Sequence, residues 1–221
     1  MKLASQSFAE GAHIPGEFAF RVPDTNDHFR LGRNRNPHLS WSGVPPEARS
    51  LVLTCHDPDL PTRMEDVNRQ GRRVSATMPR TKFFHWMLLD IPAIAGQIAA
   101  ASYSNGVVPR GKPGPEVPGG MRQGVNDFTT FFSSDAQMRG EYYGYDGPAP
   151  PWNDELVHRY VFTLHAVDVR RLEVRGALTG ANVEAALLGH VLERAMLTGL
   201  YSLNPAAARR PSAAASRGGE S

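Results

Sequence analysis

The apolar residues of this chain gather in short runs that are rich in β-branched and aromatic side chains. The clearest runs cover Ser50–Cys55, Phe83–Ile91 and His158–Asp168. Runs of this length and composition, separated by segments with Pro, Gly, Asn and Asp, are typical of β-strands. A weaker alternation over Phe18–Val22 predicts a further strand. The pattern therefore favours a mainly β protein.

The run that starts at His158 carries both apolar and polar side chains. Because side chains alternate along a strand, His158, Tyr160, Phe162 and Leu164 share one face. A His and a Tyr at the start of the strand then lie above an apolar floor. The preceding segment Gly147–Pro151 reads GPAPP, and its backbone has little conformational freedom to lose. This arrangement predicts a small preformed pocket with a few polar groups.

A helical period follows towards the C-terminal end. One row recurs every four residues, and a second row adjoins it: Val183, Leu187, Val191 and Ala195, then Leu188, Leu192, Met196 and Leu200. Asn182 is suited to cap the N-terminus of this segment, and Gly199 to end it. The pattern predicts a helix over Asn182–Leu200. A short helix is also expected within residues 126–140.

The segments between these runs have a different composition. Thr62–Lys82 is polar and basic without a clear period, and a loop of this length in a compact domain is usually functional or disordered. We expect it to lie beside the pocket and to control access to it. The stretch 206–221 is of low complexity and is predicted to be a disordered tail. Residues 1–205 then form a single domain.

Composition narrows the class of protein. The chain has 221 residues, 41% of them hydrophobic, which is enough for one β-rich domain with a sizeable core. A net charge of +2 is too weak to favour a nucleic-acid partner. The sequence shows no integral membrane segment and no apolar signal-peptide region, so a cytoplasmic location is the expectation. Cys55 is the single cysteine and is predicted to be a buried core thiol.

Four polar side chains are candidates for a common site. Asp57 follows the first strong strand, His85 opens the second, and His158 and Tyr160 begin the third. If these strands are neighbours, the two imidazoles and the hydroxyl converge and can donate hydrogen bonds to an anion. Asp57 would orient an imidazole or receive a ligand ammonium. Trp86 and its aromatic neighbours would supply an apolar wall.

Other interpretations of the same residues stay open at this point. They could make separate buried hydrogen bonds, and this is as consistent with the spacing as a shared site. They could also be acid–base groups of a hydrolase, with Asp57, His85 and His158 in those roles. A metal site is less favoured, because no HxH or HExxH spacing occurs. No phosphate-binding P-loop or dinucleotide motif is present, so no cofactor is expected.

These motifs together resemble the phosphatidylethanolamine-binding protein family, in its bacterial Raf-kinase-inhibitor-like branch. Asp57–Pro61 is similar to the family's D-P-D-A-P, Gly147–Pro151 to G-P-C-P-P, and His158-Arg159-Tyr160 to H-R-Y. His85-Trp86 resembles a strand start of the family. Further similarities are Asn36–Trp41, Gly189–Leu192 and Gly199–Tyr201, the last two resembling the closing helix, so the resemblance spans roughly residues 14–204.

The resemblance implies an antiparallel β-sandwich with peripheral helices and a pocket for phosphate-like groups, including phospholipid head groups. It places these residues at the pocket: Asp57, His85, Trp86, Gly147, Pro148, Ala149, Pro150, His158 and Tyr160. Ala149 replaces the family's cysteine, so any thiol-dependent property there is lost. Members are described as binders and as inhibitors of kinases or proteases. The expectation is non-catalytic binding of a small phosphorylated or anionic ligand, with a kinase or protease partner and a homodimer left open.

Overall fold

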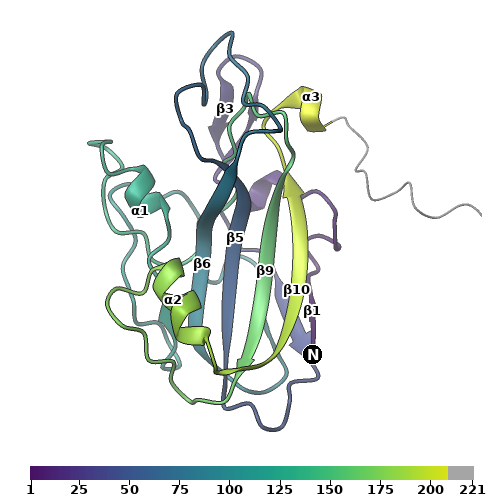
Figure 1. Cartoon of the computed structure of the whole chain (residues 1–221), viewed down its shortest axis with the longest axis vertical. Helices are drawn as coiled ribbons and strands as arrows, with labels where there is room; N and C mark the ends of the chain where they lie inside the picture. The colour runs from purple at the N-terminus through teal and green to yellow at the C-terminus, as the bar shows by residue number, and fades with distance from the viewer. Residues whose placement is uncertain (209–221) are drawn as a thin grey trace, which may run out of the picture.

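The computed structural model describes residues 1–208 and consists mainly of two antiparallel β-sheets. The larger sheet has five strands in the order β10-β9-β5-β6-β8, and the smaller has three in the order β1-β4-β7. The larger sheet comprises β10 (Val191–Tyr201), β9 (His158–Val167), β5 (Ser50–Pro61), β6 (Arg80–Pro92) and β8 (Arg122–Gln123). The smaller comprises β1 (Lys2–Ala4), β4 (Leu39–Ser42) and β7 (Gly96–Ile98). Figure 1 shows the long strands side by side.

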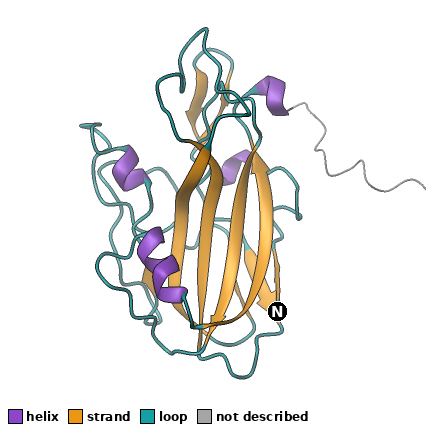
Figure 2. Ribbon diagram, viewed as in Figure 1, coloured by secondary structure: helices purple, strands orange, loops and turns teal. Residues whose placement is uncertain are grey.

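The remaining elements lie around the two sheets (Figure 2). A separate hairpin joins β2 (Arg21–Asp24) to β3 (His28–Leu31). The helical segments are short: η1 (Gly16–Phe18), α1 (Phe128–Phe131), α2 (Gly180–Leu187) and α3 (Pro205–Ala208). The short helix expected within residues 126–140 is α1. In the part of the chain that the structure describes, no helix is long and apolar enough to cross a membrane.

The main hydrophobic core fills the space between the two sheets. Leu53 of β5, Trp86 and Leu88 of β6, and Phe162 of β9 are at most 1% exposed and pack with Leu39 of β4. A second, smaller core lies on the outer face of the large sheet, where Val183 and Leu187 of α2 cover apolar side chains of β5, β6 and β9. Burial of this apolar surface is the main driving force for folding. The expected β-sandwich with peripheral helices is confirmed. Cys55 is buried in the main core, as predicted, and so is Trp41.

The predicted helix over Asn182–Leu200 is wrong. The helix α2 begins earlier, with Thr179 as its N-cap, and ends at Leu187. Gly189 then adopts φ = 83°, a left-handed conformation that suits glycine and turns the chain into β10. The side chains of Ala195, Leu197 and Tyr201 are buried in the main core in the alternating pattern of a strand. Gly199 lies inside β10, where a Cβ atom would be 2.4 Å from Ile14 Cγ1.

The structure also differs from the sequence prediction near the N-terminal strand and at the start of the predicted tail. The first predicted strand, Phe18–Val22, is replaced by η1 and by β2, which begins at Arg21. The boundary of the predicted tail at residue 206 is too early, because Ala207 of α3 is 2% exposed. The part of the predicted tail beyond residue 208 lies outside the described residues.

Candidate functional site

The three strands that carry the candidate residues are neighbours in the large sheet, in the order β9-β5-β6. Their side chains therefore meet, with His158 at the start of β9 as expected, whereas Asp57 and His85 lie inside their strands. β5 continues through Asp57 to Pro61, and β6 begins five residues before His85. The site thus lies within the sheet.

Two irregularities of the β5–β6 ladder determine which side chains face the site. Cys55 pairs with Trp86 and His56 with Phe84, so His85 is an extra residue on β6. Asp57 pairs with Phe83 and Leu60 with Thr81, so β5 also contains an extra residue before Leu60. An extra residue of this kind is a β-bulge, which bends a strand and re-aims its side chains. The bulge at His85 turns its imidazole to the same side of the sheet as Trp86.

A small cavity lies at this place. Its volume is about 30 Å³, enough for a water-sized group. Most of its lining is apolar, and Phe131 at 40% exposed is the least covered of the aromatic side chains around it. The lining residues are Asp57, Leu60, Phe83, His85, Phe128, Phe131, Ala149, Pro150, His158 and Tyr160.

Tyr160 and His85 present polar atoms that lack a well-formed hydrogen bond to the protein. The Tyr160 hydroxyl is buried and makes no hydrogen bond of ordinary geometry with any described residue, although the Asp57 carboxylate lies close to it. Burial, followed by the nearby Asp57 carboxylate, raises the pKa of Tyr160 well above its ordinary value, so the phenol keeps its proton. The rings of Tyr160 and His85 meet edge-on, with centroids 5.1 Å apart. A buried hydroxyl without a partner costs free energy, which makes it a candidate for a ligand contact.

The tautomer of His85 follows from its surroundings. Its Nδ1 lies 2.7 Å from the carbonyl oxygen of Asp146, which can only accept, so Nδ1 carries the proton. Burial lowers the pKa of His85, which favours the neutral ring. Nε2 therefore holds a lone pair, and no described residue bonds to it. Neutral His85 is an acceptor towards the cavity rather than the donor that was expected.

The Asp146 carbonyl is itself held in place by a buried polar network. The carboxylate of Asp146 accepts hydrogen bonds from Asn34 Nδ2 at 2.7 Å and Asn126 Nδ2 at 2.8 Å. It also pairs with Lys112 Nζ at 2.8 Å. Lys112 in turn donates to the carbonyl of Tyr145. The orientation of His85 is thus fixed by groups far apart in the sequence, as is common for residues that support a functional site.

His158 is not available to an anion in the way that was expected. Its Nδ1 donates to Asp57 Oδ2 at 2.7 Å, and its Nε2 donates to Asp154 Oδ2 at 3.1 Å. Burial alone would lower its pKa, but these two carboxylates raise the pKa of His158 to about 9. The ring is therefore a buried imidazolium cation, and both of its donors are used. The expectation that Asp57 holds an imidazole from behind agrees with this geometry.

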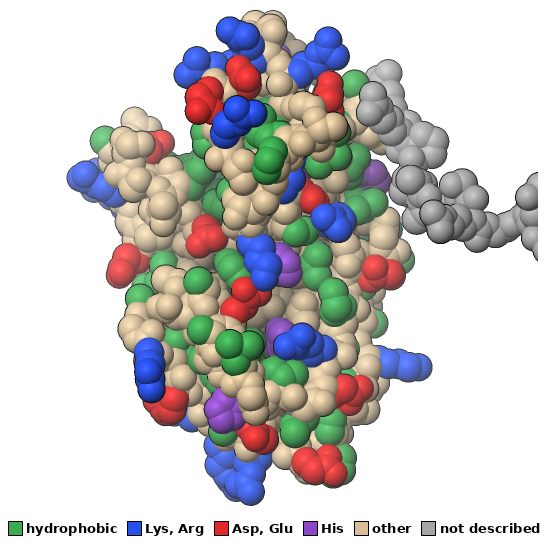
Figure 3. All heavy atoms as spheres, viewed as in Figure 1, with side chains coloured by type: hydrophobic (Ala, Val, Ile, Leu, Met, Phe, Trp, Pro, Cys, Tyr) green, Lys and Arg blue, Asp and Glu red, His purple; other side chains and the backbone are tan. Residues whose placement is uncertain are grey.

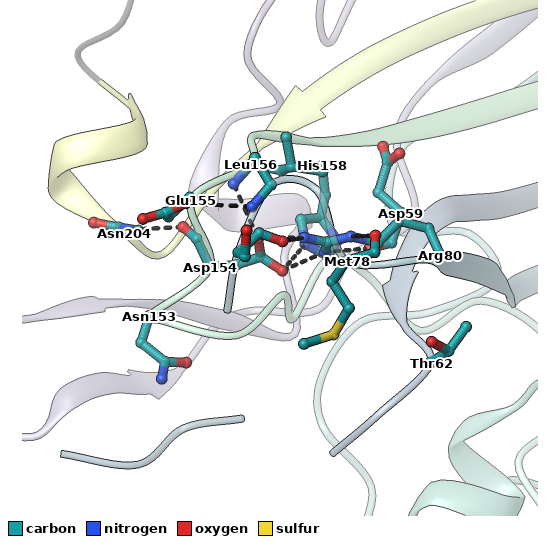
Figure 4. A network of polar contacts seen from close by, with 12 residues as sticks. Asp59, Thr62, Met78, Arg80, Asn153, Asp154, Glu155, Leu156, His158 and Asn204 are labelled. Carbon is teal, nitrogen blue, oxygen red and sulfur yellow. Dashed lines mark hydrogen bonds and ion pairs between the residues drawn. The ribbon is translucent and has the colours of Figure 1, made fainter. Parts of the chain in front are cut away.

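Asp154 extends this pair into a chain of alternating charges (Figure 4). Its carboxylate binds Arg80 in a bidentate manner, with N–O distances of 2.5 and 3.0 Å. It also accepts from the backbone N–H of Leu156 at 2.9 Å. Burial opposes its ionisation, but the bonds from His158 and Arg80 hold the pKa of Asp154 below its ordinary value. Asp57, His158, Asp154 and Arg80 together carry no net charge.

The Gly147–Pro151 segment forms the rim of the cavity. Ala149 and Pro150 line it, whereas Gly147 and Pro148 do not. The Gly147 N–H donates to Asn34 Oδ1 at 2.8 Å. The Pro148 carbonyl accepts from the N–H groups of Phe20 and Arg21. These two residues thus attach the rim to the N-terminal part of the chain.

Trp86 does not belong to the cavity. Its side chain is fully buried in the main core, and its Nε1 donates to Gln123 Oε1 at 3.0 Å. The expected wall is therefore only partly formed as predicted: Trp86 lies further along β6 in the main core, whereas its neighbour Phe83 lines the cavity. Phe128 and Phe131 of α1, which the sequence did not single out, complete the apolar wall.

The expected excursion between β5 and β6 covers residues 62–79 and is attached to the rim segment. Asn153 accepts from the N–H of Asn68, and its amide donates to the Asp66 carbonyl at 2.8 Å. None of residues 62–79 lines the cavity. The excursion lies at the upper end of the molecule (Figure 1). Figure 3 shows Lys and Arg side chains interleaved with Asp and Glu side chains at that end. Of the lining residues, only Leu60, Ala149 and Phe131 are not buried, and a gate made by the excursion stays a prediction.

Asp154 and Arg80 are the charged members of the site that the sequence did not single out. Asp154 lies four residues before His158, but in a loop, where this spacing does not imply proximity. Arg80 stands within the stretch Thr62–Lys82, which was expected to be a loop without a regular element. Within residues 1–208, no group of three or more His, Cys, Asp or Glu side chains has an arrangement that could hold a metal ion.

Fold and site together define a β-sandwich with a buried Asp–His pair beneath a proline-rich rim, and comparison with known proteins assigns the family. The model of the phosphatidylethanolamine-binding protein family matches residues 4–202. The chain therefore belongs to the phosphatidylethanolamine-binding protein family.

Individual relatives support this assignment. The chain is 30% identical to the UPF0098 protein YbhB of Escherichia coli over 91% of its own length and 100% of that protein. It is 32% identical to a UPF0098 protein of Methanothermobacter thermautotrophicus over 91% of this chain and 98% of the other. Among solved structures it is similar to Escherichia coli YbcL, described as a member of the mammalian PEBP family, with a TM-score of 0.64 and 25% identity over 91% and 97% of the two chains.

Proposed function

We propose that a small phosphorylated or phosphate-like anion binds at the cavity without chemical turnover, with an oxygen atom in the water-sized space and the rest of the anion at its exposed side beside Phe131. The observation that carries the proposal is the buried Tyr160 hydroxyl, which makes no well-formed hydrogen bond with a described residue and whose ring meets the ring of neutral His85 edge-on. A bound phosphate oxygen would accept from Tyr160. A protonated phosphate oxygen would donate a hydrogen bond to His85 Nε2.

The cavity offers one donor and two acceptors. Tyr160 donates, whereas His85 Nε2 and the Asp57 carboxylate accept. This set favours an anion that brings its own proton, such as a phosphate monoanion or monoester, over sulfate, which has none near neutral pH. An ammonium group on the ligand, as in phosphoethanolamine, would find Asp57 as its acceptor. A phospholipid-head-group-like ligand therefore fits the same groups.

The acid–base hydrolase is the less favoured alternative. His158 cannot serve as a base while both of its nitrogens donate to carboxylates. The Asp57 carboxylate already accepts hydrogen bonds from His158 and from the N–H of Asp59, which makes it a weak base, although each oxygen can still accept a further bond. Only His85 has a nitrogen available for proton transfer. Regulation of a kinase or protease has no supporting contact or charge pattern in residues 1–208, and the proposal is confined to the small ligand.

Replacement of Tyr160 with Phe is expected to weaken phosphate binding about tenfold, because a hydrogen bond to a charged group contributes roughly 1.5–3 kcal/mol. Isothermal titration calorimetry with inorganic phosphate at pH 7 measures the effect. Tyr142→Phe is the matched control, since the Tyr142 hydroxyl donates to the carbonyl of Met138 and lies outside the cavity lining.

The same titrations with sulfate test the role of His85. Wild type should prefer phosphate at pH 7, and sulfate binding should strengthen as the pH falls below 6.5, because protonated His85 donates from Nε2. In His85→Ala this pH dependence should be lost. Wild type that binds neither anion, or a Tyr160→Phe variant that binds phosphate as tightly as wild type, would overturn the proposal.

A further inference from the structure

Arg21 is a largely buried arginine without a partner. Its side chain makes no ion pair and no hydrogen bond with any described residue, and its Nε is buried. Burial lowers the pKa of Arg21, and no neighbouring charge contributes to that shift. A charge that is partly desolvated and has no counter-ion is unfavourable. Arginines of this kind usually serve a ligand or a partner, because their planar donors match phosphate and carboxylate groups.

Two aromatic rings partly compensate for the missing counter-ion. The guanidinium carbon lies 4.2 Å from the centre of the Phe29 ring and 5.8 Å from that of Phe131. Cation–π contacts at such distances stabilise a cation less than a well-formed ion pair can inside a protein. The rings hold the side chain in place and leave its N–H donors for another group.

The position of Arg21 relates it to the proposed anion cavity. Phe131, which contacts the guanidinium, also lines the cavity. The backbone N–H of Arg21 donates to the carbonyl of Pro148, which precedes the lining residues Ala149 and Pro150. The Phe131 ring is 6.4 Å from that of Phe83, and the Phe83 ring is 4.9 Å from that of His85. Two aromatic rings therefore separate the arginine from the imidazole.

We propose that Arg21 is a second anionic subsite, so that the ligand is a small molecule with two anionic groups joined by a largely apolar spacer. The first group, of phosphate type, occupies the cavity at Tyr160 and His85. The spacer lies along the Phe131 ring, and the second group, a phosphate or a carboxylate, binds the guanidinium. This inference rests on the proposed function and specifies its ligand class. It also supplies an uncompensated positive charge, since the His158 cation of the cavity is balanced by Asp57 and His85 is neutral.

A series of alkane bisphosphonates of increasing length tests the inference. Each is compared by calorimetry with the alkylphosphonate of the same chain length, so that the apolar contribution of the chain cancels. Wild type should bind one length of bisphosphonate about tenfold more tightly than its monophosphonate match, since a charge-assisted bond is added. Arg21→Met should lose that preference and keep the affinity for the monophosphonate. Arg30→Met, on the adjacent strand β3, is the matched control and should keep both.

The outcomes separate this inference from the proposed function. If wild type binds neither inorganic phosphate nor any monophosphonate, the proposed function fails and the inference fails with it. The inference alone is overturned if phosphate binds but no bisphosphonate binds more tightly than the alkylphosphonate of the same length. It is also overturned if Arg21→Met still binds the bisphosphonate more tightly than that alkylphosphonate. A nitrogen NMR measurement on wild type gives a readout that does not depend on the variant folding: the Arg21 Nε–H resonance should shift with the bisphosphonate and not with the monophosphonate.

Discussion

Replacing Asp154 with Ala is expected to lower the free energy of unfolding by about 3–5 kcal/mol, because it leaves two buried cations without their shared partner. Asp154 is fully buried and binds both Arg80 and His158. Arg80 would keep its bond to the carbonyl of Asp59, and His158 its bond to Asp57, so part of each charge stays compensated. Urea unfolding at pH 7 measures the loss.

Glu155→Ala is the control for this experiment. Glu155 is the next residue in the chain and pairs with Arg73 at 3.6 Å on the surface, where an ion pair contributes about 1 kcal/mol or less. Asp154→Asn removes the charge with little change of shape. Its loss in the free energy of unfolding should lie between the losses for Asp154→Ala and Glu155→Ala. A loss for Asp154→Ala no larger than that for Glu155→Ala would show that the buried chain of charges does not stabilise the fold.

The stability of the protein is expected to fall as the pH rises from about 6.5 to 9. The pKa of His158 is raised from 6.5 to about 9 in the folded state. A group with a raised folded pKa contributes stability that is fully present below its unfolded pKa and is lost as the pH passes its folded pKa. The shift corresponds to roughly 3 kcal/mol as an upper estimate.

Three other histidines should make the stability of the protein fall as the pH is lowered below about 6.5. Burial lowers the pKa of His85 and His56, and it lowers that of His165 to about 4. Their contribution is present above pH 6.5 and is lost as the pH falls, so the stability maximum should lie near pH 6.5. Urea unfolding across this range, with His158→Gln as the comparison, checks the alkaline limb. NMR titration of the His158 ring in wild type gives its pKa directly, and a value near 6.5 would contradict the account.

The strands that are buried on at least one face were the most predictable part of the fold. Three runs contain more apolar residues than a loop would carry: Ser50–Cys55, Phe83–Ile91 and His158–Asp168. All three lie in strands of the large sheet. β10 was not predictable in the same way. Its apolar residues also fit a period of four, and the left-handed turn at Gly189 that separates it from α2 depends on tertiary packing.

The members of the site could be foreseen in part. Asp57, His85, His158 and Tyr160 come together because their strands are neighbours, which was the condition for the shared site that the sequence predicted. Their hydrogen-bonding roles could not be foreseen. The bulge at His85 depends on the register of two strands, and the charge of His158 depends on Asp154, a loop residue. The unpartnered state of Arg21 is likewise a property of the folded chain alone.

The most direct test of the central claim is a crystal structure of the protein grown with inorganic phosphate. The account predicts a phosphate in the cavity, with one oxygen about 2.5–3.0 Å from the Tyr160 hydroxyl and another at about the same distance from His85 Nε2. His158 should keep both of its carboxylate partners in that complex. A cavity without phosphate, or a phosphate bound by His158 in place of Tyr160 and His85, would contradict the account.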